Sequence, residues 1–353
     1  MNNSKISLIL LWLALFTLGC NKEEYELQTT YDYSCLIINQ GNFSEANGEL
    51  SLLGSNGEIK NQVYQTSNQW ALASIIESAI GYKNHWILFC SNEDKIEIID
   101  QQELKLQKSI TGVPIPRYGA TMEDMLYVTS VEDWTDNSSG KVYKINLQNG
   151  EILNKMSLGN LPEGILYFED NIWIAADDTI YVISEKNDQI IKKIPTERKL
   201  LSAKHLIAGE NGMVWCSLSS HKEDGELILI DEEKMTIVQR NKIPHLSYEG
   251  HIVLSPNKEN IYYLTSNSTI GAQNADGETK ICRWNISAQT SQIVIDGVGF
   301  YGFNIHPKTE DIYTANVNGF ITNSLFYQYD KNGKIIRNGD LVGVGACRFL
   351  FRH

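Results

Sequence analysis

A repeat of about 46 residues runs through the chain and constrains its fold more than any other feature. A short, alternating apolar segment that ends at a turn residue recurs seven times, with final residues Gly54, Asp100, Asn146, Ser184, Asp231, Asn285 and Asp330. Successive copies end 38 to 54 residues apart. An aromatic residue precedes the segment in six units, at Trp86, Tyr127, Trp173, Trp215, Tyr262 and Tyr313. Because a period of about 40–50 residues is typical of four-stranded propeller blades, the repeat predicts an all-β, seven-bladed β-propeller.

The amino-acid composition supports this prediction. Ile occurs 41 times and Tyr 17 times, whereas Ala occurs only 15 times. β-branched and aromatic residues favour strands, and Ala is the strongest helix former. A length of 353 residues would by itself favour about two domains, but seven units of this period fill the chain as one ring. The net charge of −13 opposes a nucleic-acid partner, because phosphates would be repelled.

Turn signals divide the repeat into blades. Pairs such as Asn149-Gly150 and Asn332-Gly333 mark hairpins. We expect one blade in each of the segments 68–112, 113–160, 161–198, 199–245, 246–298 and 299–345. The first blade has only three convincing strands, between Ser34 and about Gln65. We expect the final segment, 346–352, to supply its fourth strand, which closes the ring through both termini and leaves no open edge.

The N terminus has the features of a targeting segment. Lys5 precedes an apolar run of 13 residues, Ile6–Leu18. A membrane-spanning helix needs about 20 apolar residues, so this run is typical of a secretory signal instead. Gly19-Cys20 resembles the end of a bacterial lipobox, although the two preceding residues depart from the usual pattern. We expect residues 1–19 to be a lipoprotein signal peptide and Cys20 to be lipidated; the alternative is an ordinary signal peptide.

A short polar stretch separates the predicted lipid from the propeller. We expect residues 20–32 to be a lipidated tether and residues 33–353 to form the propeller. Asn21–Glu24 resembles the acidic export signal that sends some lipoproteins to the outer face of the outer membrane. We therefore expect a lipid-anchored outer-membrane protein exposed at the cell surface, while the sequence leaves open whether the anchor faces the periplasm or the exterior.

Five cysteines remain if Cys20 carries lipid: Cys35, Cys90, Cys216, Cys282 and Cys347. An odd number cannot all form pairs within the chain. None belongs to a CxxC or CxxH motif, so no metal site is predicted. Cys35 and Cys347 lie in the first and last predicted strands, which should be neighbours. The sequence leaves open whether these two cysteines form a disulfide.

Several motifs carry a family resemblance, and their order and spacing matter more than any one of them. They are Ile37–Phe43, Pro116–Tyr118 followed by Leu126–Thr129, Leu161–Glu163, and the last-blade residues between Tyr301 and Asp330. Together they resemble the YncE-like, YVTN-type β-propeller lipoproteins. They are most similar to the BtuG-like surface cobalamin-binding propellers of Bacteroidetes-type outer membranes, although Gln40 stands where that branch usually has Glu.

The resemblance implies a function. The BtuG-like proteins sit on a TonB-dependent transporter at the cell surface, where they capture cobalamin and related corrinoids. This chain is accordingly expected to bind a corrinoid (vitamin B12-type) as a transported ligand rather than a cofactor. It would pass the ligand to a TonB-dependent outer-membrane transporter and be a monomer apart from that complex. Binding of another nutrient, or a role as a protein-docking scaffold, remains an alternative.

Ligand-binding residues are expected on the propeller face that carries the loops between second and third strands and the links between blades. Aromatic rings there would cover the apolar faces of a corrinoid, and polar side chains would bond its amides. The candidates are Asn42, Phe43, Trp70, Arg117, Tyr118, Trp134, Glu163, His205, His221, Tyr248, Tyr301 and Phe320. Arg117 is either a ligand anchor or a salt-bridge partner of Glu163. His205, His221 and His251 are candidate cobalt ligands.

The sequence contains no GxSxG elbow, HExxH motif or Walker loop. Asp177, Asp178, Glu163 and Asn137 supply oxygen atoms, but their spacing matches no calcium site. We therefore expect a protein that is not an enzyme, with a lactonase-type or lyase-type propeller as the less favoured alternative.

Overall fold

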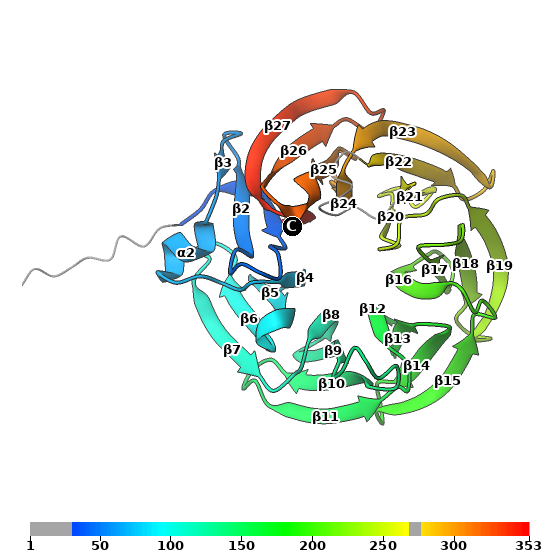
Figure 1. Ribbon diagram of the computed structural model, residues 1–353. Helices are drawn as coiled ribbons and strands as arrows, with labels where there is room; N and C mark the ends of the chain where they lie inside the picture. Colours follow the sequence, from blue (N-terminus) through cyan, green and yellow to red (C-terminus); the bar gives the residue numbers. More distant parts are fainter. Residues whose placement is uncertain (1–29, 268–276, 353) are drawn as a thin grey trace, which may run out of the picture.

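Seven β-sheets form a ring in the computed structural model, which describes residues 30–267 and 277–352 (Figure 1). Within these residues every sheet has four strands, and successive strands pair in antiparallel fashion. The predicted seven-bladed propeller is therefore confirmed. The predicted signal peptide, Cys20 and the tether up to residue 29 lie outside the described residues.

The seven blades follow one another along the chain. Blade 1 contains β28 (Ala346–Phe351), β1 (Tyr33–Asn39), β2 (Glu49–Gly54) and β3 (Ile59–Lys60). Blade 2 contains β4 (Ile76–Tyr82), β5 (His85–Cys90), β6 (Lys95–Asp100) and β7 (Leu106–Thr111), and blade 3 contains β8 (Pro116–Met122), β9 (Met125–Val131), β10 (Gly140–Asn146) and β11 (Ile152–Ser157). Blade 4 contains β12 (Pro162–Phe168), β13 (Asn171–Ala176), β14 (Thr179–Ser184) and β15 (Gln189–Pro195), and blade 5 contains β16 (Ser202–Ala208), β17 (Met213–Ser219), β18 (Gly225–Asp231) and β19 (Thr236–Ile243). Blade 6 contains β20 (Ile252–Leu254), β21 (Asn260–Ser266), β22 (Glu278–Asn285) and β23 (Thr290–Val298), and blade 7 contains β24 (Phe300–Ile305), β25 (Ile312–Asn316), β26 (Asn323–Tyr329) and β27 (Ile335–Val344).

Blade 1 closes the ring as predicted. Its innermost strand, β28, pairs with β1, so the two ends of the propeller lie in one sheet. Leu36 of β1 stands opposite Leu350 of β28, and both ends of the chain contribute to its core. The closure uses hydrogen bonds that would otherwise be left open at the first and last strands.

The outer part of blade 1 differs from the prediction. β3 is only two residues long, and a short helix, α2 (Val63–Asn68), occupies the stretch where the strand was expected to continue to Gln65. The carboxylate of buried Glu49 accepts hydrogen bonds from the backbone N–H groups of Leu50 and Tyr64, at 2.7 and 3.2 Å. This buried acceptor satisfies an N–H of the first helical turn, which local strand propensity does not reveal.

The periodic aromatic residues pack between blades. Trp86, Tyr127, Trp173, Trp215, Tyr262 and Tyr313 are all buried, with side chains at most 4% exposed. Each belongs to the second strand of its blade, where a large ring fills the space between neighbouring sheets. These six rings therefore belong to the core between the blades.

The disulfide left open between Cys35 and Cys347 is not formed, and the five cysteines of the described chain are free thiols. Cys35 stands opposite Phe351, whereas Cys347 lies beside Arg348, which stands opposite Ile38. The strands pair as expected, but Cys347 lies about four residues along the pair from the position opposite Cys35. At about 3.3 Å per residue this separation is about 13 Å, beyond the reach of a disulfide.

A β-bulge recurs in the innermost strand of the blades. The register shifts near Glu77, Arg117, Glu163, Lys204, Tyr301 and Cys347. A bulge leaves backbone groups unpaired and re-aims the side chain beside it. In blade 3 the Thr129 hydroxyl satisfies backbone groups that the bulge leaves unpaired. It accepts a hydrogen bond from the Tyr118 N–H at 3.0 Å and donates one to the Glu163 carbonyl of the next blade at 2.9 Å. The bulges therefore re-aim a side chain of the innermost strand in six of the seven blades; the innermost strand of blade 6, β20, has none.

The N-terminal end of the described chain packs against blade 2. Tyr31 is buried and its N–H bonds the Gln102 carbonyl at 2.8 Å, so packing begins two residues before the predicted start of the propeller. Within the described residues no helix is long and apolar enough to cross a membrane.

Candidate ligand-binding site

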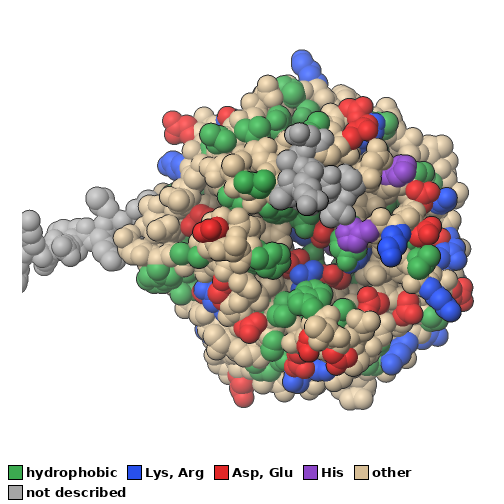
Figure 2. All heavy atoms as spheres, viewed as in Figure 1, with side chains coloured by type: hydrophobic (Ala, Val, Ile, Leu, Met, Phe, Trp, Pro, Cys, Tyr) green, Lys and Arg blue, Asp and Glu red, His purple; other side chains and the backbone are tan. Residues whose placement is uncertain are grey.

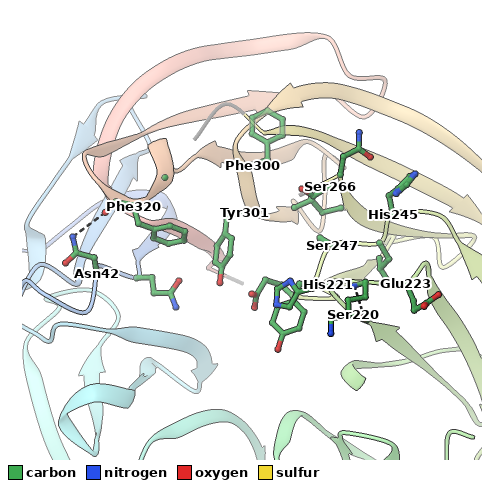
Figure 3. A pocket seen from close by; sticks show the side chains of 18 of the residues that line it. Asn42, Ser220, His221, Glu223, His245, Ser247, Ser266, Phe300, Tyr301 and Phe320 are labelled. Atoms are coloured by element: carbon green, nitrogen blue, oxygen red, sulfur yellow. Dashed lines mark hydrogen bonds between the residues drawn. The ribbon is translucent and has the colours of Figure 1, made fainter. Parts of the chain in front are cut away.

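A cavity of about 660 Å³ opens on the predicted face (Figure 3). Its walls come from blades 1, 5, 6 and 7, through the loops after β1, β17, β21 and β25 and the link before β20. Six of the twelve candidate residues line it: Asn42, Phe43, His221, Tyr248, Tyr301 and Phe320. The structure therefore brings together residues that lie up to 278 positions apart in the chain.

Aromatic rings form two walls of the cavity. On one side His221 stacks on Tyr248, with ring centroids 3.5 Å apart and planes 14° from parallel. On the other side Tyr301 meets Phe320 edge-on, at 4.9 Å and 86° (Figure 3). The Asn42 side-chain amide donates to the Phe320 carbonyl at 3.3 Å and ties the loops of blades 1 and 7 together. Such walls suit a ligand with flat apolar faces.

A ring of mostly charged side chains surrounds the channel beside the cavity. We call it the channel ring; it takes one residue from the innermost segment of each blade, namely Glu77, Arg117, Glu163, Lys204, Glu249, Tyr301 and Arg348. Consecutive members are 40 to 52 residues apart in sequence. Their charges alternate in sign from Glu77 to Glu249. Figure 2 shows acidic and basic side chains inside the central hollow of this face.

Ion pairs link four members of the channel ring. Arg117 lies between two carboxylates, with Nη1 2.7 Å from Glu77 and Nη2 2.6 Å from Glu163. The Lys204 ammonium lies 3.4 Å from the other oxygen of Glu163. Burial by itself would raise the pKa of Glu163, but Arg117 and Lys204 outweigh it and lower that pKa. Burial raises the pKa of Glu77, against the opposing effect of Arg117.

These contacts bear on the two interpretations of Arg117. Its guanidinium pairs with Glu163, as one interpretation required, and it also contacts the Trp134 ring, whose centroid lies 5.1 Å away. Neither Arg117 nor Glu163 lines the cavity. Tyr118 likewise lies at the channel, where its hydroxyl accepts a hydrogen bond from Arg348 at 3.1 Å. A direct ligand contact by these residues stays a prediction.

The remaining candidates lie outside the cavity lining. Trp70 is 52% exposed in the link between α2 and β4. His205 lies in β16, where its ring centroid is 4.8 Å from that of His251, and burial lowers its pKa to about 4. Of the three candidate cobalt ligands, only His221 lines the cavity. In the part of the chain that the structure describes, no group of three or more His, Cys, Asp or Glu side chains could hold a metal ion.

Most residues of the channel ring were not among the candidates predicted from the sequence. Glu77, Lys204, Glu249 and Arg348 were not identified from the sequence, and neither were polar cavity residues such as Glu223. The repeat itself carried the signal: each ring residue stands near the start of the innermost strand, at one position of the 46-residue register. Comparing that position across the seven units would have found the ring.

Fold and site together define a seven-bladed β-propeller with a ligand-sized cavity at one end of its channel. The chain belongs to the family described as "Domain of unknown function (DUF5074)", whose model matches residues 33–341. That description names no activity. No curated protein matches the chain in sequence.

Solved structures share the fold at low sequence identity. A functionally unknown protein from Desulfotomaculum acetoxidans superposes with a TM-score of 0.66 at 11% identity, over 91% of this chain and 99% of that one. A protein described as a "putative 6-phosphogluconolactonase" from Bacteroides uniformis gives 0.65 at 13% identity, over 90% and 100%. A protein with the same description from Bacteroides fragilis gives 0.63 at 13% identity, over 90% and 98%. These likenesses show the fold alone.

Proposed function

We propose that this propeller is a binding protein that takes up a corrinoid in its aromatic cavity and delivers it to a TonB-dependent outer-membrane transporter. The observation that carries the proposal is the pair of aromatic walls, the His221–Tyr248 stack and the Tyr301–Phe320 pair, around about 660 Å³. A corrinoid is a broad ring with apolar faces and a fringe of amides. The walls match its faces, and the polar lining from Gln40 to Asn267 matches its edge.

The cavity can serve a ligand larger than itself. Phe43, at the rim, is 81% exposed, so burying its ring against a bound ligand would remove apolar surface from water. The parts of a corrinoid that exceed the cavity would project over this rim into solvent.

The distribution of exposed apolar side chains supports transfer to a protein partner. An apolar crown of large exposed residues surrounds the cavity face: Phe43, Trp70, Trp134, Leu200, Tyr248 and Ile321. The other exposed large apolar residues of the described chain lie in the fourth strands of the blades, such as Leu153 in β11. The opposite face carries polar turns such as Glu169-Asp170. Large apolar side chains exposed on one face are typical of a docking surface, so we expect the transporter to contact the crown.

Calorimetry with cyanocobalamin and cobinamide tests the proposal on the soluble chain from Glu23. We expect binding, and we expect Tyr248→Ala and Tyr301→Ala each to weaken it about tenfold, because each removes an aromatic wall. Tyr167→Ala, in β12 and outside the cavity lining, serves as the matched control and should bind like the wild type. Absence of heat and of any spectral shift at micromolar protein would refute the corrinoid.

The same experiment addresses the alternatives. The described function of two similar structures makes a lactonase the second candidate. Recovery of the corrinoid unchanged, with no turnover of 6-phosphogluconolactone, is the expected result for a binding protein. A purely docking scaffold would instead retain its outer-membrane partner in pull-downs whether or not a corrinoid is present.

A further inference from the structure

On one side of the channel ring, ion pairs join neighbouring members. On the other side, which we call the open side, the charged members Glu249 and Arg348 form no ion pair with a described residue. Glu77, Arg117, Glu163 and Lys204 are joined by contacts of 2.6 to 3.4 Å. Across the channel, no described residue makes an ion pair within 4.0 Å or a hydrogen bond with the Glu249 carboxylate. Among the described residues Arg348 likewise has no carboxylate within that distance, and the hydrogen bonds of its guanidinium go to neutral oxygens, those of the Tyr118 hydroxyl and the Cys347 carbonyl, at 3.1 and 3.2 Å.

The open side of the ring borders the cavity. Glu249 and Tyr301 both line it, whereas none of the four paired members does. Tyr301 stands between Glu249 and Arg348 in the order of the blades, and Figure 3 shows its side chain directed into the cavity. A ligand held between the aromatic walls would therefore meet an acceptor at Glu249 and a donor at Tyr301, while Arg348, the next member of the ring, lies outside the cavity lining.

The charge balance of the ring selects among ligand groups. Three carboxylates face three cations, so the ring as a whole is neutral and offers no net attraction to a charged ligand. A desolvated charge costs free energy unless a partner compensates it. A ligand carboxylate would suit Arg348 but meet Glu249 without a proton to donate. An ammonium would suit Glu249 but leave Arg348 unpaired. A carboxamide donates through N–H and accepts through its carbonyl, and it carries no charge.

We propose, on the basis of the proposed function, that the open side of the channel ring recognises a carboxamide of the ligand. Its N–H donates to Glu249, and its carbonyl accepts from the Tyr301 hydroxyl. This site makes the protein selective for amide-bearing ligands over the corresponding acids, because the acid places a second negative charge beside Glu249.

Calorimetry with a matched pair of ligands tests the site: cyanocobalamin, and cyanocobalamin whose side-chain amides have been hydrolysed to carboxylic acids. We expect the wild type to bind the amide form at least tenfold more tightly. Glu249→Gln should weaken binding of the amide form about tenfold and reduce the preference to within about twofold. Glu233→Gln, which alters an exposed carboxylate in the turn between β18 and β19 and outside the cavity lining, should keep both affinity and preference. Because no described residue forms a hydrogen bond with the Glu249 carboxylate, this variant should unfold at the wild-type temperature.

The outcomes separate this inference from the proposed function. Equal binding of both forms by the wild type, or an unchanged preference in Glu249→Gln, overturns the amide site and leaves the corrinoid proposal standing. If the wild type binds no corrinoid, the proposed function fails, and thermal shift with millimolar nicotinamide and nicotinate then tests the site directly. Nicotinamide should stabilise the wild type but not Glu249→Gln, and nicotinate should stabilise neither. Equal shifts, or none, overturn the inference.

Discussion

Neighbouring residues at the propeller axis have pKa values shifted in opposite directions because different charged groups lie beside them. Lys204 and His205 are neighbours in β16, yet the carboxylate of Glu163 helps to raise the pKa of Lys204 against the effect of burial. His205 has no such partner; burial first, and then the positive charge of Arg348, lower its pKa to about 4. His251, 4.8 Å away, is likewise shifted far downward, mainly by burial. The two histidines are therefore neutral in the folded protein.

This neutrality predicts a loss of stability in mild acid. An unfolded histidine has a pKa of about 6.5, so below that pH the unfolded chain binds more protons than the folded one. The contribution of His205 is fully present above pH 6.5 and falls away toward pH 4, by at most about 3 kcal/mol. Urea unfolding between pH 7 and 4.5 should therefore show a smaller pH slope for His205→Gln than for the wild type. His245→Gln, at an exposed position, should keep the wild-type slope, and equal slopes for all three proteins would contradict the prediction.

Among the elements, the innermost strands carry both the fold and the site. Their bulges lie beside six of the seven members of the channel ring, and hydroxyls of second strands, such as Thr129 and Ser217, bond across to the next blade. β28 contributes Arg348 to the ring and Phe349 to the core between blades 7 and 1. It is also the strand through which the ends of the propeller meet.

Truncation tests the role of β28. A chain that ends at Gly345 lacks the innermost strand of blade 1 and exposes β1 and its apolar core. We expect it to lose the cooperative unfolding transition measured by circular dichroism and to aggregate in gel filtration. A chain that ends at Phe351 keeps all of β28 and should unfold like the full-length protein. Cooperative unfolding of the shorter chain would show that the ring does not depend on this closure.

At the scale of the whole molecule, the two ends of the propeller have opposite character. One end carries the cavity, the open side of the channel ring and the apolar crown, while the other carries polar turns. The chain enters the ring at blade 1, at its outer side (Figure 1). We propose that a lipid at Cys20 anchors the propeller to a membrane.

Membrane attachment through Cys20 is tested by fractionation of cells. Cys20→Ala removes the predicted lipid site, so we expect the protein to move from the membrane fraction to the soluble fraction with its propeller folded. Asn21→Ala, one residue away, should remain with the membrane. Retention of Cys20→Ala in the membrane fraction would contradict the lipid anchor.

Sequence patterns predicted the parts that local physics repeats. Seven units of similar length, each with alternating apolar residues and turn signals, specify seven blades because each unit obeys the same rules of strand and hairpin formation. The closing strand at 346–352 was predicted in the same way, because the first unit has only three strands and a blade needs four. Helix α2 did not follow, because its stability depends on the buried carboxylate of Glu49, 14 residues before Val63. Half of the candidate residues line the cavity, since loop position alone does not tell which loops converge.

The sequence by itself determined the number of blades, their boundaries and the face on which loops gather, since these depend on contacts within one unit and its neighbours. Only the tertiary structure decided which side chains meet at the axis. Arg117 pairs with Glu77 and Glu163, 40 and 46 residues away, whereas Glu249, which lines the cavity, has no ion pair with any described residue. The interaction energy of two charges decreases with the distance between them. The distances across the ring are fixed only when all seven blades have folded and the ring has closed.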